Sequence, residues 1–169
     1  MTSMKVTFAQ EAAPAAPVVR DLLAVDREYR RKARAGKLPL IAPRRLNPSG
    51  RAWLPVLHTS RDGRRYTALF SNTATAHLRG RTGDWVVLYY GGDGDSGQVT
   101  IVTEWHGPLQ GKRVVRGREV ECLEVYGVTP HPDSEVVRWE PDDSSALLED
   151  HAPVVEQLAL EADAVRAHA

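Results

Sequence analysis

Residues 53–71 read WLPVLHTSRDGRRYTALFS, and this stretch decides the fold. Its two halves have the side-chain alternation of strands, and between them stands Asp62-Gly63. That dipeptide is typical of a tight turn joining antiparallel strands. We therefore predict a hairpin with strands at Trp53–Thr59 and Arg65–Ser71, and an antiparallel sheet built around it.

The chain after this hairpin continues the sheet. Strand-like segments follow at 84–90, 98–104, 112–115 and 119–125, with a glycine-rich loop over 91–97. A short helix of about two turns is predicted between the N-cap residues Ser71-Asn72-Thr73 and the stop signal Gly80. The sequence therefore predicts a single, mostly hairpin-connected sheet of about five or six strands.

A helix is predicted at each end of the chain. Val18, Val19, Leu22 and Leu23 recur at helical spacing, and Gly36 is a natural stop for a helix beginning near Pro17. A second amphipathic helix is predicted from Pro153, with its apolar residues on one face. The fold class is therefore α+β, with an N-terminal helix, a short inserted helix and a C-terminal helix.

Prolines and changes in composition divide the chain. Residues 1–16 are expected to be disordered, and 17–126 form a basic α+β domain in which 38–50 is an extended, proline-rich arm. Residues 127–145 form an acidic linker, and 146–169 form the amphipathic C-terminal helix. The apolar face of that helix needs a partner, which is its own domain, a second subunit in a homodimer or another protein.

The net charge of zero conceals two opposite charges. Residues 27–118 hold 18 Lys and Arg against six Asp and Glu, whereas 119–169 hold two Arg against 13 Asp and Glu. A basic surface is the electrostatic footprint of a polyanion, most often nucleic acid. An acidic tail that folds back and neutralises the body is an alternative explanation, and both can hold.

Several function classes find little support in the sequence. The lone Cys122 excludes an intrachain disulfide and is predicted to be a small buried residue. The six histidines lack zinc-motif spacing, and the Asp93–Gly97 run lacks the distal glutamate of a calcium loop. We predict no metal, no cofactor and no membrane association. With no apolar run of membrane-spanning length and no signal peptide, the protein is expected to be soluble and cytoplasmic.

The candidate nucleic-acid contacts are mostly arginines, whose planar forks match phosphate geometry. Aromatic residues interleaved with them are suited to stack on bases. A solvated surface without a ligand is the alternative. The predicted contacts are Arg30, Arg31, Lys32, Arg34, Lys37, Arg44, Arg45, Arg51, Trp53, Arg79, Arg81, Lys112, Arg113, Arg116 and Arg118.

A second constellation consists of polar residues at strand ends. His58, His77 and Glu104 are candidate proton donors and acceptors, and Arg116 is a candidate for stabilising a phosphorane. These are the groups that metal-independent phosphodiester cleavage requires. Capping or surface roles for the histidines are the alternative.

The runs Ile41-Ala42-Pro43-Arg44-Arg45, Trp53–Thr59, Leu69–Thr73 and Gly111–Glu119 carry a family resemblance. Residues 22–126 resemble a module of certain bacterial and archaeal proteins, where it follows helix-hairpin-helix segments similar to the N-terminal part of X-family DNA polymerases. The resemblance implies a DNA-associated role without a defined reaction. This sequence shows the module without the helix-hairpin-helix half and adds the acidic segment 130–169.

Three hypotheses follow from these observations. The first is a nucleic-acid-binding domain, for DNA rather than RNA, acting in DNA maintenance or repair, with the acidic segment as a regulatory or partner-binding element. The second is a small metal-independent nuclease. The third is an interaction module whose basic face binds an acidic protein.

Overall fold

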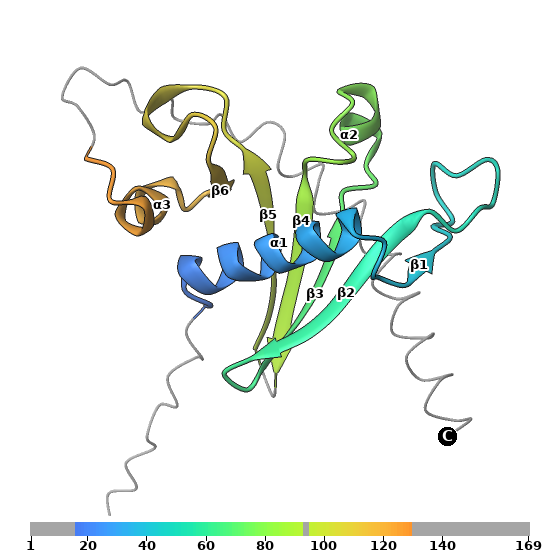
Figure 1. The fold of residues 1–169 in the computed structure, drawn as a ribbon, viewed down its shortest axis with the longest axis horizontal. Helices are drawn as coiled ribbons and strands as arrows, with labels where there is room; N and C mark the ends of the chain where they lie inside the picture. The colour runs from blue at the N-terminus through green and yellow to red at the C-terminus, as the bar shows by residue number, and fades with distance from the viewer. Residues whose placement is uncertain (1–15, 93–94, 130–169) are drawn as a thin grey trace, which may run out of the picture.

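The computed structural model describes residues 16–92 and 95–129, which form one six-stranded antiparallel sheet with helices around it (Figure 1). The strands are β1 (Leu40–Ile41), β2 (Leu54–Arg61), β3 (Arg64–Phe70), β4 (Val86–Gly92), β5 (Asp95–Thr103) and β6 (Arg113–Val115). They lie side by side in the order of the sequence, β1 to β6. The predicted α+β class and its hairpin connections are thereby confirmed.

The β2–β3 hairpin has the predicted tight turn. Asp62 and Gly63 take φ angles of 49° and 76°, the left-handed conformation that a two-residue turn of this kind requires at both positions. Arg61 pairs with Arg64 across the turn, and Val56 pairs with Leu69 near the other end. The local sequence therefore sets the register of the central strands.

The β4–β5 hairpin is longer than the sequence predicted. Both strands run into the expected loop at 91–97, and their ladder reaches the pair Gly92–Asp95. Tyr90 pairs with Gly97, and a Cβ atom at Gly97 would lie 2.4 Å from the Tyr90 ring. A side chain at this position would therefore require the Tyr90 ring to move.

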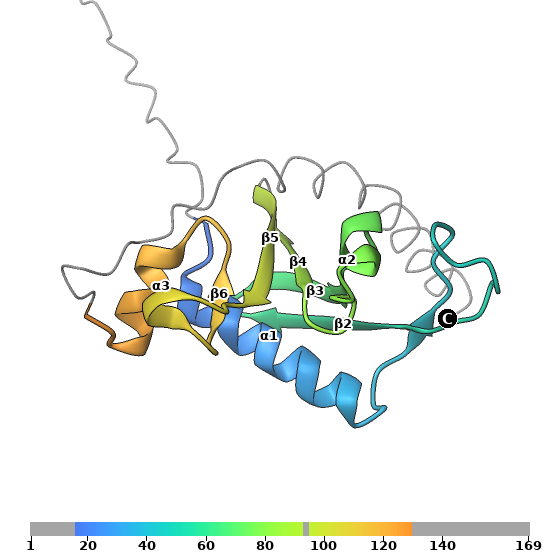
Figure 2. The same ribbon diagram turned by 90° about the horizontal axis from the view of Figure 1, so that it is seen from above.

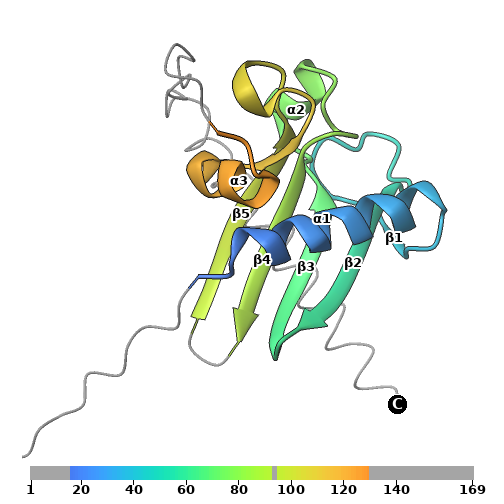
Figure 3. The ribbon, with the colours of Figure 1, turned by 60° about the vertical axis from the view of Figure 1, so that its left-hand side comes forward.

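Helix α1 (Val19–Arg34) crosses the strands on one face of the sheet, as Figures 2 and 3 show. Its buried side chains Leu22, Val25 and Tyr29 follow helical spacing and pack with Leu57, Tyr66, Ala68 and Leu88 of the sheet. The last turn is basic, where cations interact favourably with the helix dipole. The predicted N-terminal helix is confirmed.

Two short elements complete this part of the chain. Helix α2 (Ala74–Leu78) is the predicted inserted helix, and the Thr73 hydroxyl caps it by accepting a hydrogen bond from the Ala76 N–H at 3.1 Å. The arm at 38–50 is not wholly irregular, because Leu40 and Ile41 pair with Pro55 and Leu54 as β1. An edge strand of two residues tolerates the neighbouring prolines.

The predicted strand at 119–125 is wrong. After the 3-10 turn η1 (Gly107–Leu109) and β6, residues Glu119–Tyr126 form helix α3, which packs against α1 and β6. Cys122 and Leu123 are both buried, whereas Val120 is 65% exposed, so the apparent alternation of period two does not describe burial. Gly127 ends the helix in the left-handed conformation.

Cys122 is fully buried, as predicted, and burial raises the pKa of its thiol. Residues 1–15, predicted to be disordered, lie outside the described residues. So do residues 130–145 of the predicted acidic linker and the predicted helix from Pro153. None of the helices in the described ranges is long and apolar enough to cross a membrane.

Candidate nucleic-acid interface

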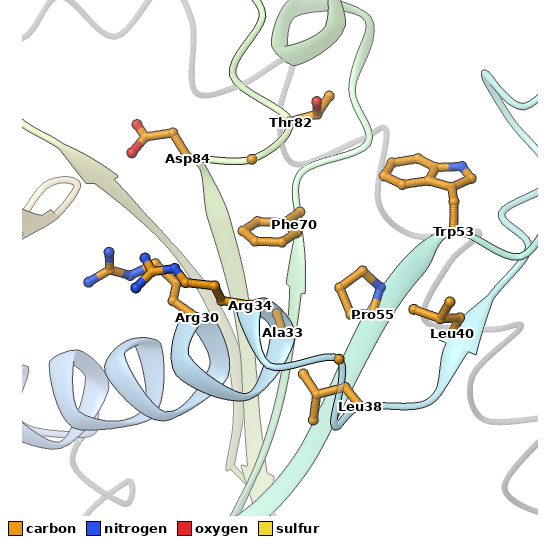
Figure 4. Close-up of a pocket in the computed structure, with 12 residues that line it drawn as sticks. Arg30, Ala33, Arg34, Leu38, Leu40, Trp53, Pro55, Phe70, Thr82 and Asp84 are labelled. Atoms are coloured by element: carbon orange, nitrogen blue, oxygen red, sulfur yellow. The ribbon is translucent and has the colours of Figure 1, made fainter.

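A pocket of about 640 Å³ opens at the C-terminal end of α1 (Figure 4). Arg30 and Arg34 of α1 line one side, and Phe70 lies at the end of β3. Trp53 borders the pocket beside β2, and Asp84 lies at the opposite rim before β4. The pocket thus combines aromatic rings with arginines, and its size is that of a small-molecule site.

An ion-pair network centred on Arg113 includes two residues of the pocket lining, Arg30 and Asp84. The Nε and Nη2 of Arg113 donate to Asp26 at 3.1 and 2.8 Å, and its Nη1 donates to Asp84 at 2.8 Å. The remaining N–H groups donate to the Thr103 hydroxyl and the Ile101 carbonyl oxygen, both at 3.1 Å. All five donors of a guanidinium are therefore occupied, and the residue is only 8% exposed.

In this fold Arg113, a predicted phosphate contact, has no N–H group left for a phosphate. Asp26 is fully buried, and a buried carboxylate requires a cationic partner. Arg113 supplies that partner and ties α1 to β6 and to the start of β4. Its role is structural.

Other predicted contacts also have partners within the domain. Lys32 pairs with Glu28 at 2.7 Å, and Arg116 pairs with Glu104 at 3.3 Å. Arg118 forms a bidentate ion pair with Glu121 of α3, and this pairing lowers the pKa of the Glu121 carboxyl group.

Two more predicted cations lie over aromatic rings. The guanidinium of Arg81 lies 5.1 Å from the ring centre of Trp105, and the Lys112 ammonium lies 4.9 Å from that of Tyr126. Arg45 and Arg79 also interact with other groups.

Seven predicted contacts are exposed, and five of them, all but Arg45 and Arg79, form a separate group. The side chains of these five make no ion pair or hydrogen bond with any residue within 16–92 and 95–129. All five lie at the end of α1 or in the segment that follows it up to β2, and this group is called the basic end. Its members are Arg31, Arg34, Lys37, Arg44 and Arg51.

The basic end adjoins the pocket. Figures 1 and 3 show the C-terminal end of α1 beside β1 and the connection that leads to β2. Arg34 belongs to both the basic end and the pocket lining. Arg34 thus links the exposed cations of the basic end to the pocket.

The aromatic side of the pocket is held by packing. The Trp53 ring meets the His77 ring edge to face at 6.1 Å, and Phe70 meets Tyr29 in the same way at 4.9 Å. His77 also shares a hydrogen bond of 2.6 Å with the Asn72 side chain. The predicted base-stacking residue Trp53 therefore lies at the pocket, and Phe70, which the sequence did not single out, lies with it.

The predicted catalytic residues are not all brought together. His58 of β2 is level with Gln98 of β5, three strands away, and Glu104 follows six residues later. Strand spacing places His58 roughly 14 Å across the sheet and roughly 20 Å along it from Glu104. His58 instead contacts Thr67 at 3.0 Å.

Glu104 and Arg116 do lie together as an ion pair. Glu104 also accepts hydrogen bonds from the N–H groups of Trp105 and His106, so it stabilises its own turn. His77 has other partners, Asn72 and Trp53. Within residues 16–92 and 95–129, no hydrogen bond or ring contact links either histidine to this ion pair.

Sequence reasoning missed the acidic residues that organise the site. Asp26 stands one turn after Leu22 on the apolar stripe of α1, and an acid at a core position signals a buried cationic partner. Asp84, which follows Gly83 before β4, carries no comparable signal.

The described part of the chain contains no cluster of three or more His, Cys, Asp or Glu residues that could hold a metal ion. No protein-family model, curated protein or solved structure matches this chain.

Proposed function

We propose that this protein binds nucleic acid, DNA in preference to RNA, through the basic end and the adjoining pocket. The observation that carries this proposal is the concentration of five exposed cations without partners in the described domain. Elsewhere many cations are used internally, as in the fully occupied Arg113 fork. Cations kept free beside aromatic rings are the usual means of holding phosphates and bases.

The resemblance of residues 22–126 to a module found beside helix-hairpin-helix segments supports DNA as the ligand. It also supports a role in DNA maintenance or repair. The acidic segment 130–169, with ten Asp and Glu against two Arg, is proposed to regulate this binding or to recruit a partner protein.

The direct test is titration of the full chain against labelled single-stranded and double-stranded DNA and RNA, with and without EDTA. If the basic end neutralises phosphates, the logarithm of the affinity falls linearly with the logarithm of the salt concentration. The slope is about −0.9 per phosphate contact on duplex DNA and about −0.7 on single strands. The same samples show any cleavage.

Charge reversal locates the surface. Arg44→Glu with Arg51→Glu should weaken binding of all sequences alike and reduce the salt slope. The matched control is Arg20→Glu with Arg65→Glu, which makes the same charge change at exposed positions away from the basic end. Equal losses in the two variants, or association that does not depend on salt, would refute the proposal.

A further inference from the structure

We infer that the pocket takes an unstacked base of single-stranded nucleic acid, with Arg34 on a neighbouring phosphate. This inference rests on the proposed function and adds a strand preference to it. The occupant has two chemical parts, a flat aromatic base and an anion, and the pocket presents a matching surface for each. The matching surfaces are Trp53 with Phe70, and Arg34.

The aromatic surface suits a base. Trp53 and Phe70 both line the pocket, and Leu38, Leu40 and Pro55 add apolar contacts around them (Figure 4). Trp53 is braced by His77, and Phe70 by Tyr29, so neither ring depends on the ligand for its position. Rings held in place lose little conformational entropy when a base stacks on them.

The charge of the pocket comes from Arg34. Arg30 donates to Asp26 at 3.1 Å, and Arg113 pairs with both Asp26 and Asp84. Two arginines and two aspartates therefore balance within the network. Arg34, which has no partner in the described domain, leaves the site with one positive charge beside its aromatic surface.

Duplex DNA does not present this combination. Its bases are paired and stacked, so one enters a pocket only after it is extruded from the helix. A single strand offers unstacked bases next to phosphates without that cost. The pocket geometry therefore predicts preference for single strands, whereas phosphate contacts at Lys37, Arg44 and Arg51 do not distinguish the two forms.

The test compares a fluorescent 12-nucleotide thymidine strand with an abasic strand of the same length, using the full wild-type chain. The two probes carry the same phosphates, and only one carries bases. Stacking of a base on an aromatic side chain corresponds to about 5- to 150-fold in affinity, and we expect a loss in this range with the abasic strand.

Two variants assign the effect to the pocket. Trp53→Ala should weaken binding of the thymidine strand and leave the abasic strand unchanged. Arg34→Gln, at an exposed position, should weaken both strands more than its matched control, Arg31→Gln, on the same helix outside the pocket. Circular dichroism and thermal unfolding establish that each variant folds.

The outcomes separate the two proposals. Equal affinity for the thymidine and abasic strands, with a normal salt slope, overturns the base pocket and leaves phosphate binding in place. An equal effect of Arg34→Gln and Arg31→Gln also contradicts the assigned role of Arg34. Failure to bind any nucleic acid at low salt overturns the proposed function and the base pocket together.

Discussion

Replacement of Arg113 tests the structural role of the buried ion-pair network. Arg113→Met keeps much of the side-chain length and removes the guanidinium. Asp26, whose side chain is 1% exposed, then loses two of its three hydrogen bonds and keeps that from Arg30. The Ile101 carbonyl oxygen loses the hydrogen bond that it accepts from the guanidinium.

The expected cost follows from these losses. Removing one partner of a buried ion pair destabilises a protein by about 3–5 kcal/mol, because the other charge is left uncompensated. Arg30 still holds one oxygen of Asp26, so we expect the lower end of this range, about 3 kcal/mol. For a domain of this size that corresponds to a fall in Tm of about 10–15 °C.

Urea denaturation followed by circular dichroism measures the free energy of unfolding. The matched control is Arg61→Met, which breaks another ion pair between α1 and the sheet, to Glu28. Because the Arg61 side chain is 37% exposed, its removal should cost no more than about 1 kcal/mol. The reasoning is refuted if Arg113→Met loses no more free energy of unfolding than Arg61→Met. It is also refuted if the loss in the Asp26→Asn, Arg113→Met double variant equals the sum of the losses in the two single variants.

Three further predictions concern stability and binding. Tyr29→Phe should cost about 1–3 kcal/mol, because the hydroxyl accepts from the Phe70 N–H and donates to the Pro55 carbonyl. Burial raises the pKa of the Tyr29 hydroxyl, so the wild-type protein should lose free energy of unfolding as the pH rises above about 10. Tyr29→Phe should lose less over the same range. Urea denaturation of both proteins at pH 7 and 10.5 measures the difference. The hydrogen bond from Lys32 lowers the pKa of Glu28, so Glu28→Gln should cost at most about 1 kcal/mol at neutral pH. This cost should shrink as the pH falls below about 4.3, the ordinary pKa of a glutamate, and a pH series of urea titrations checks it. Deletion of 130–169 removes ten acidic and two basic residues and should tighten DNA binding at low salt, and a soluble truncated protein with unchanged affinity would contradict this.

The parts of the fold that the sequence predicted are those set by neighbouring residues. Asp62-Gly63 adopts positive φ angles at both positions, and this turn aligns β2 with β3 whatever the rest of the chain does. The spacing of Val19, Leu22 and Leu23 reports the buried face of α1 because helix geometry places such residues together. Thr73 caps α2 through an atom three residues away.

The secondary structure of a short segment was decided by the elements that it packs against. Residues 119–126 fit a strand by alternation and a helix by the pair Cys122-Leu123, and packing against α1 and β6 selects the helix. In an eight-residue segment, local preference is too weak to decide between the two.

The candidate site was decided by the tertiary structure. The sequence identified Trp53 and a body rich in arginine. It did not separate the arginines that form ion pairs inside the domain from those that have no partner in its described part. Arg113 and Asp26 lie 87 residues apart in the chain and 2.8 Å apart in the fold, and that contact converts a predicted phosphate ligand into a buried support. Composition determines how many cations the chain carries, whereas burial beside a carboxylate, which only the folded chain can produce, determines which of them remain available to a ligand.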